Sequence, residues 1–288
     1  MIEGAAGNEA VKVALDERVG VIGLGIIGSV WAANYAADGL LVATWNRSPK
    51  SRVPRPVADA SAVARASTVL HIVVSDPSAV EQVLSAIEPE LGPTQLVIQS
   101  TTIDPESATA FAKRVKARGA SYVEAPFMGS RPAAEQRKTV FLMGGAEPGV
   151  GRALSVLAHL SSVRRLVGSE AQAAALKLSF NLHVAITMQG LCESLRLSRQ
   201  SGLSDEDYFE ILRGTALWSG FHSLKEPKLR SGEYAPQFSI KHMLKDVRLA
   251  TGLAGASAPL GVAVRAQLAL ASDAGLSEED MSALIEVL

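Results

Sequence analysis

A glycine-spaced segment near the N-terminus constrains the fold of this chain more than any other feature. Gly23 ends the apolar run RVGVIG, and Gly25 and Gly28 lie between that run and SVWAANYAADG, a stretch with helical spacing. Between a strand and a helix, this spacing allows a tight turn, a close approach of phosphates to the backbone, and close packing of the helix on the strand. The amides and the dipole at a helix start also favour bound negative charge. The sequence therefore predicts a dinucleotide pyrophosphate site, in preference to a simple packing turn, at Gly23, Leu24, Gly25, Ile26, Ile27 and Gly28.

The first part of the chain alternates short apolar runs with helical segments, between residues 18 and 167. The runs are RVGVIG, LLVATW, TVLHIVV, QLVIQS, SYVEAP, TVFLMGG and SVRRLVG. Such alternation predicts βαβ crossovers and a doubly wound, mostly parallel sheet, which is the α/β Rossmann architecture. One helix is expected to begin at Pro105 behind Asp104 as its cap.

After about Ser169 the strand pattern stops, and the remaining sequence predicts helices separated by glycine-containing breaks. The stretch from Glu170 to about Arg199 contains no proline and one glycine, Gly190, which allows a single helix of roughly 45 Å. This helix is apolar on several faces, so we expect it to be buried between the sheet and the later helices. The predicted organisation is an N-terminal extension with a dinucleotide-binding domain at residues 1–168, and an all-α domain that begins with the long interdomain helix at residues 169–288.

Composition excludes several classes of protein. The chain has 28 Lys and Arg against 29 Asp and Glu, too balanced for the basic face that nucleic-acid binding needs. Mean hydropathy is +0.19, but no apolar stretch of about 18 residues predicts a membrane span, and the N-terminus carries no secretory pattern. A lone cysteine, Cys192, excludes an internal disulfide and favours a cytoplasmic location. Five dispersed histidines predict no metal site.

The end of the second apolar run indicates which dinucleotide binds. An NAD enzyme places a carboxylate there, on the adenosine ribose, but the sequence ATWNRS contains none. Cations follow instead, at Arg47, Lys50, Arg52 and Arg55. With Asn46 and Ser48, Arg47 offers hydrogen-bond donors and positive charge to a 2′-phosphate. The pattern predicts NADP(H) as the cofactor, with a solvated basic loop as the alternative.

Five segments follow one another in a fixed order along the chain. They are GLGIIG, NRS, EAPFMGS at residues 124–130, KLSFN at residues 177–181 and FSIKHMLKD at residues 238–246. In this order they resemble the β-hydroxyacid dehydrogenases, and most closely their glyoxylate and succinic semialdehyde reductase branch. The resemblance covers about residues 18–285. It implies a Rossmann domain, a long interdomain helix and a helical C-terminal domain that completes the active site.

By this resemblance, Lys177 matches the family's catalytic lysine and Asn181 the asparagine one helical turn beyond it. An i,i+4 pair also places both polar side chains on one face of an otherwise apolar helix. A lysine there can protonate a carbonyl oxygen, and desolvation lowers its pKa toward a working value. A lysine that extends to solvent is the alternative. Thr102 follows a predicted strand and aligns with the threonine near nicotinamide and substrate, whereas a simple helix-capping role is its alternative.

The remaining site residues are also implied by the resemblance. Val74 and Ser75 contact the cofactor through the backbone, or form a simple turn. In the last segment, Phe238 matches a pocket phenylalanine, Lys245 a cofactor-facing lysine and Asp246 the acid two turns later. The alternative for that segment is an ordinary amphipathic helix.

The segment expected to hold the substrate carboxylate runs from Glu124 to Ser130, with Met128, Gly129 and Ser130 as the binding residues, and it departs from the family. Serine is usual where Met128 stands, and a thioether cannot donate the hydrogen bond that a hydroxyl gives. Ser130 offers a nearby hydroxyl. Downstream, Arg137 and Lys138 replace the common Gly-Thr pair. The substrate is therefore less constrained by the sequence than the reaction type.

These features predict NADPH-dependent reduction of a small carboxylate-bearing aldehyde or keto acid, of the glyoxylate or succinic semialdehyde class, with Lys177 as general acid. A 3-hydroxyisobutyrate or tartronate semialdehyde dehydrogenase, an imine reductase and a catalytically silent NADP-binding protein are the alternatives. We expect a homodimer or homotetramer, because the helices carry more apolar surface than one sheet domain covers. Cys192 and His242 are expected to be purely structural.

Overall fold

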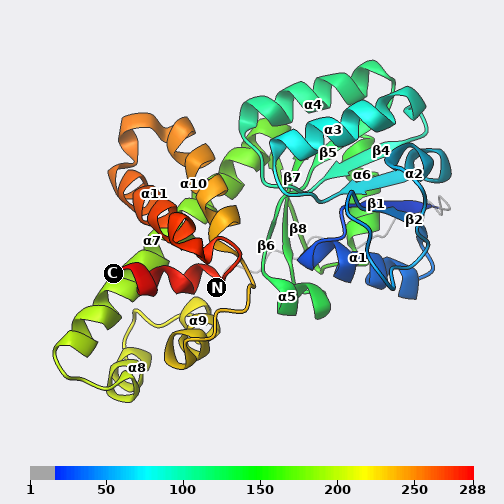
Figure 1. Cartoon of the computed structure of the whole chain (residues 1–288). Helices are drawn as coiled ribbons and strands as arrows, with labels where there is room; N and C mark the ends of the chain where they lie inside the picture. Colours follow the sequence, from blue (N-terminus) through cyan, green and yellow to red (C-terminus); the bar gives the residue numbers. More distant parts are fainter. Residues whose placement is uncertain (1–16) are drawn as a thin grey trace, which may run out of the picture.

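The computed structural model describes residues 17–288 of the chain. The predicted N-terminal extension, and the expectation that it is not a secretory signal, fall on residues 1–16 and lie outside the described residues. The described chain forms a sheet region, residues 17–168, and a helical region, residues 169–288, which lie side by side (Figure 1).

The sheet region is built on eight strands, which follow the order β2-β1-β3-β4-β5-β7-β6, with β8 also paired to β7. Strands β1 to β5 are parallel, whereas β7 runs antiparallel to β5 and β6. The seven predicted strands are all confirmed, and a two-residue strand, β6, was missed because it leaves no apolar run. The bounds are β1 (Val19–Ile22), β2 (Leu41–Trp45), β3 (Val69–Ile72), β4 (Leu96–Gln99), β5 (Ser121–Glu124), β6 (Phe127–Met128), β7 (Val140–Gly145) and β8 (Val163–Gly168).

Helices cover both faces of this sheet, which confirms the doubly wound arrangement. Helices α2, α3 and α4 pack on one face and α1 and α6 on the other (Figure 1). Asp104 caps α4 by accepting a 2.8 Å hydrogen bond from the Ser107 amide, with Pro105 in the first turn, as predicted. The bounds are α1 (Ile26–Ala37), α2 (Ala60–Ala66), α3 (Pro77–Ile87), the 3₁₀ turn Glu88–Glu90, α4 (Pro105–Ala117), α5 (Arg131–Glu135) and α6 (Gly149–Leu157).

The helical region begins with one long helix, α7 (Glu170–Gln200), as predicted. Ser169 and Gln172 exchange hydrogen bonds in a capping box at its start. Its first turns pack on the sheet region and its later turns on the helical core (Figure 1). The helix lies between the two regions as expected, but its burial is incomplete, since Phe180 is 41% and Leu197 is 65% exposed.

The helices that follow α7 are short and fold back against it. They are α8 (Asp205–Arg213), α9 (Gly220–Ser231), α10 (Ile240–Ala254), the 3₁₀ turn Gly255–Ser257, α11 (Pro259–Ala271), the π-helical turn Ser272–Leu276 and the 3₁₀ helix Met281–Val287. Helices α10 and α11 lie against α7. The N-terminal half of α10 faces the sheet region (Figure 1). Within residues 17–288, no helix is both long and apolar enough to cross a membrane.

Candidate active site

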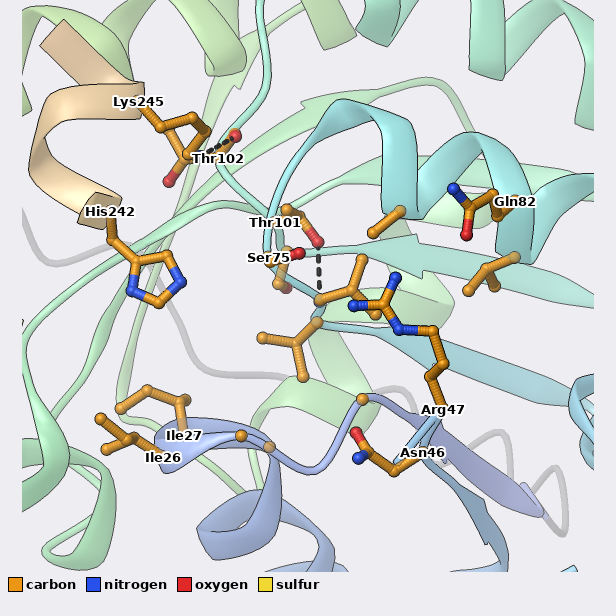
Figure 2. Close-up of a pocket in the computed structure, with 18 of the residues that line it drawn as sticks. Ile26, Ile27, Asn46, Arg47, Ser75, Gln82, Thr101, Thr102, His242 and Lys245 are labelled. Carbon is orange, nitrogen blue, oxygen red and sulfur yellow. Dashed lines mark hydrogen bonds between the residues drawn. The ribbon is translucent and has the colours of Figure 1, made fainter. Parts of the chain in front are cut away.

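A cavity of about 380 Å³ runs along the carboxyl ends of strands β1 to β4 and is closed on one side by α10. Ligands of doubly wound sheets bind at this edge. The lining comes from the loops after the four strands and from the segment that leads into α10 (Figure 2). The lining residues predicted from the sequence are Gly23, Gly25, Ile26, Ile27, Gly28, Asn46, Arg47, Ser48, Val74, Ser75, Thr102, Phe238, Lys245 and Asp246.

The glycine loop between β1 and α1 has the shape that a bound diphosphate requires. A Cβ atom on Gly23 would lie 2.1 Å from the Val73 carbonyl oxygen, and Gly23 has φ +100°. A Cβ on Gly28 would lie 2.0 Å from the Gly23 carbonyl oxygen. A Cβ on Gly25 would meet no protein atom within 4 Å, so its absence leaves the backbone open to the cavity. No side chain caps the first turn of α1. These features fit a dinucleotide whose phosphates approach the first amides of α1.

Asn46 links this loop to the end of β2 through hydrogen bonds. Its Oδ1 accepts a 2.8 Å hydrogen bond from the Leu24 amide, and its Nδ2 donates to the Ser48 carbonyl oxygen at 2.7 Å. Leu24 is 1% exposed and does not line the cavity. The Leu24 amide is therefore already hydrogen-bonded to Asn46, and Leu24 lies behind the predicted cofactor site.

The basic segment after β2 contributes one cation to the cavity. Arg47 lines it with Ser48, is exposed, and forms no ion pair with another residue of the described chain. Its side chain extends toward Gln82 of α3 (Figure 2). Lys50, Arg52 and Arg55 do not line this cavity. Of the four predicted cations, Arg47 is therefore the one placed to meet a 2′-phosphate.

The loops after β3 and β4 support each other. The Val74 amide donates a 2.9 Å hydrogen bond to Thr101 Oγ1, and the Thr101 amide donates to Gln99 Oε1 at 2.5 Å. The Val74 amide is consequently occupied, although Val74 and Ser75 both line the cavity. Thr102 lines it as well, and its carbonyl oxygen faces the helical region.

A chain of polar contacts links Thr102 to the candidate catalytic lysine. Lys245 Nζ donates a 2.6 Å hydrogen bond to the Thr102 carbonyl oxygen and lies 2.6 Å from Asp246 Oδ1. Asp246 Oδ2 accepts from Asn181 Nδ2 at 2.5 Å. Asn181 Oδ1 accepts from Lys177 Nζ at 2.9 Å. The structure thus brings together side chains from α7 and α10 with the loop after β4, as the resemblance implied.

Lys177 occupies a nearly closed environment beside the cavity. It is 8% exposed, its Nζ lies 3.4 Å from Met128 Sδ, and the Phe127 ring centroid is 5.8 Å away. Burial, with a smaller contribution from the charge of Lys245, lowers the pKa of Lys177 to about 8, although the carboxylate of Asp246 opposes this shift. Both protonation states of the amine are then accessible near neutral pH, which suits a group that gives and takes a proton.

The loop that carries the predicted carboxylate-binding residues continues from Met128 into α5. Gly129 has φ +115°, in the region that favours glycine, and Ser130 is the residue that precedes the first turn of α5. Neither residue lines the large cavity. Arg137 pairs with Asp38 at 2.6 and 2.9 Å, at the end of α1. Arg137, which stands where the family commonly has Gly-Thr, therefore joins the segment after α5 to the end of α1.

Among the polar residues of the cavity wall that sequence reasoning missed, three lie in or beside helices: Gln82, Gln237 and His242. A single polar residue in or beside an amphipathic helix does not indicate the direction in which its side chain points. The expectation that His242 is purely structural is therefore incomplete. Cys192, by contrast, is buried, and burial raises the pKa of its thiol to about 12, as suits a structural residue.

Asp280 fixes the wall segment that precedes α10. Its Oδ2 accepts hydrogen bonds from the amides of Gln237 and Phe238 at 3.0 and 3.2 Å, and its Oδ1 pairs with Lys225 Nζ at 2.7 Å. Asp280 is fully buried. Within residues 17–288, no group of three or more His, Cys, Asp or Glu side chains is arranged to hold a metal ion.

Comparison with known proteins places this geometry in a family. Residues 18–169 match the NAD binding domain of 6-phosphogluconate dehydrogenase, and residues 171–288 match the NAD-binding domain of NADP-dependent 3-hydroxyisobutyrate dehydrogenase. The chain is 30% identical to glyoxylate/succinic semialdehyde reductase 2, chloroplastic, of Arabidopsis thaliana, over 94% of this chain and 79% of that protein. It is 27% identical to glyoxylate/succinic semialdehyde reductase 1 of the same plant, over 94% and 98%.

A solved structure agrees at the level of the fold. The 3-hydroxyisobutyrate dehydrogenase of Salmonella typhimurium superposes with a TM-score of 0.86 at 23% identity, over 94% of this chain and all of that one. The chain belongs to the β-hydroxyacid dehydrogenase family, whose members are NAD(P)-dependent hydroxyacid oxidoreductases, and its cofactor is NADP(H).

Proposed function

We propose that the protein reduces a small aldehyde or keto acid of the glyoxylate or succinic semialdehyde class to the hydroxy acid, with NADPH as reductant. The observation that carries this proposal is the buried Lys177, joined through Asn181 to Asp246 on the cavity wall. The names of the two plant relatives support the substrate class. When bound, the nicotinamide supplies the hydride.

Lys177 acts in this proposal as the general acid. Lys177 Nζ donates one of its three N–H groups to Asn181 Oδ1 at 2.9 Å, and the sulfur of Met128 is only a weak acceptor for a second. A proton therefore remains for a carbonyl oxygen. Asp246 favours the charged form of Lys177 and holds Asn181, so both residues position the donor.

A substrate panel with NADPH, followed by cofactor absorbance, tests the proposal. The panel contains glyoxylate, succinic semialdehyde, tartronate semialdehyde and a cyclic imine, with 3-hydroxyisobutyrate and NADP⁺ for the reverse direction. We expect the first two compounds to be reduced with the highest kcat/KM. Preferential turnover of the imine, or NADPH binding without turnover of any compound, would contradict the proposed reaction.

We also propose that the chain assembles as a homodimer or homotetramer through its helical region. That region exposes large apolar side chains, each more than half accessible, at Leu197, Leu203, Ile211, Leu217, Leu253 and Leu260. Large apolar side chains left exposed in such number on one region are typical of subunit interfaces. Light scattering at micromolar concentration should report a multiple of the chain mass, and a monomer there contradicts the proposal.

A further inference from the structure

His242 faces the cofactor loop from the opposite wall of the cavity. It lies in the first turn of α10, and its ring is directed toward Ile26 and Ile27 at the start of α1 (Figure 2). The helical region therefore places an imidazole across the cavity from the loop whose amides suit a diphosphate. The motif FSIKHMLKD contains His242, but neither the sequence analysis nor the polar chain that ends at Lys177 gives this residue a role.

Ser239 determines which nitrogen of His242 carries the proton. Its Oγ lies 2.8 Å from His242 Nδ1, and the residue is 4% exposed. Within residues 17–288, the Ser239 hydroxyl has no other hydrogen-bond partner, and we assign it as the donor to Nδ1 because a buried hydroxyl would otherwise lack an acceptor. The proton of the neutral ring is then on Nε2, which has no hydrogen-bond partner in the same part of the chain. His242 thus presents an N–H donor to the cavity.

The surroundings of His242 favour the neutral form of its ring. Burial lowers the pKa of His242, and Lys241 and Lys245 lower it further, whereas Asp246 and Glu278 oppose them. The donor on Nε2 does not depend on protonation of the ring. A group that only accepts hydrogen bonds is the matching ligand chemistry, and a diphosphate is such a group.

We propose that His242 is a cofactor-binding residue whose Nε2–H donates a hydrogen bond to the diphosphate of NADP(H), opposite the amides of Gly25, Ile26 and Ile27. The diphosphate is then held from both sides, by the sheet region at α1 and by the helical region at α10. This inference rests on the cofactor and on the cavity, and it is independent of the proposed substrate.

Binding of cofactor fragments to His242→Ala and His242→Gln, measured by calorimetry, tests the proposal. Adenosine 2′-monophosphate has no diphosphate, whereas 2′-phospho-ADP-ribose has the diphosphate but no nicotinamide. We expect His242→Ala to weaken NADPH and 2′-phospho-ADP-ribose alike, by about tenfold, because a hydrogen bond to a charged group is lost. Binding of adenosine 2′-monophosphate should not change. His242→Gln retains an N–H donor and should stay within about threefold of the parent protein.

The chain contains a matched control at the start of α9. Ser219 Oγ lies 2.9 Å from His222 Nδ1, with the same serine-to-histidine spacing, but His222 does not line the cavity. His222→Ala should leave all three affinities unchanged. An equal loss in His222→Ala, an equal loss in His242→Gln, or an effect of His242→Ala on NADPH but not on 2′-phospho-ADP-ribose would each overturn the proposal.

Discussion

The two ends of the cavity are built in different ways. The adenosine end, around the glycine loop and Arg47, comes mainly from residues 19–48, in which β1, α1 and β2 follow each other. The catalytic end combines the loop after β4, strand β6, helix α7 and helix α10, and its Lys245–Thr102 contact joins residues 143 positions apart. A local sequence motif predicts the adenosine end, whereas the catalytic end forms only when the helical region packs on the sheet region.

The charges at the two ends differ as well. Arg47 at the adenosine end is exposed and unpaired within the described chain. At the catalytic end, Asp246 is 2% and Lys177 8% exposed, and both belong to one chain of contacts. Solvent screens exposed charges, whereas buried ones interact strongly. Substitutions at the catalytic end should therefore have larger effects on rate, and those at the adenosine end should affect mainly cofactor choice.

The largest effect is expected for Lys177→Ala, which removes the proposed proton donor. Turnover should fall by about 10²–10⁴, the usual contribution of general acid catalysis. NADPH affinity should be retained, because Lys177 does not line the cavity. Steady-state kinetics and calorimetry measure the two quantities. Lys177→Arg keeps the positive charge but hardly releases a proton, so it should be nearly as slow; near-normal turnover in either variant removes Lys177 from the mechanism.

Arg47→Asp should change cofactor choice at the other end. An anion in place of the one cation that reaches the cavity repels a 2′-phosphate, so the ratio of NADPH to NADH affinity should fall by roughly 10- to 100-fold. Arg52→Asp is the control, because it makes the same change of charge in the same segment outside the cavity wall. Equal affinities for both cofactors in the parent protein would show that the basic segment does not select NADP(H).

The fold was largely predictable because its signals are local. Seven apolar runs bounded by turn residues gave the strands, and the absence of proline from Glu170 onward gave the single helix α7. The two-residue strand β6 and the reversed direction of β7 were not predictable. Strand β7 pairs antiparallel with β5, and β6 pairs with β7. Both pairings arise only on folding, because no residue pattern along the chain records a strand's direction.

The site was predictable where residues share a face or a motif. The i,i+4 spacing placed Lys177 and Asn181 together, and the structure joins them by a hydrogen bond. The same reasoning could not place Gln82 or His242 at the cavity, because the sequence does not distinguish a lone polar residue that lines a cavity from one on the solvent-exposed face of an amphipathic helix. It also could not foresee that Asn46 occupies the Leu24 amide, because that contact depends on how two loops meet.

A pH profile tests whether the buried charges at the catalytic end act together. Reduction needs the protonated form of Lys177, whose pKa is lowered to about 8. The turnover number should therefore fall by about tenfold per pH unit above pH 8. Asp246→Asn removes the carboxylate that favours protonated Lys177, so the fall should begin at lower pH. An unchanged or raised midpoint in this variant would show that Asp246 does not act on the proton donor.

The smallest effect is expected for Met128→Ser, and it asks whether the loop after β6 selects the substrate. Met128 Sδ lies 3.4 Å from Lys177 Nζ, so a serine there would bring a hydroxyl close to the proton donor. A hydroxyl can donate to a substrate carboxylate, whereas the thioether cannot, and the thioether's flexible apolar bulk favours a longer substrate. The gain should be modest because Ser130 already supplies a hydroxyl on the same loop. We expect the Michaelis constant for glyoxylate to fall by about tenfold at most, and that for succinic semialdehyde to fall less.

Met128→Leu controls for volume, since it retains the bulk and supplies no donor; it should behave like the parent protein. If Met128→Ser leaves both constants unchanged, or raises the constant for glyoxylate, the carboxylate does not bind beside this residue. The substrate would then be selected at another part of the catalytic end. The wall segment that Asp280 fixes, with Gln237 and Phe238, would be the next candidate, because both side chains line the cavity and no local motif placed Gln237 there.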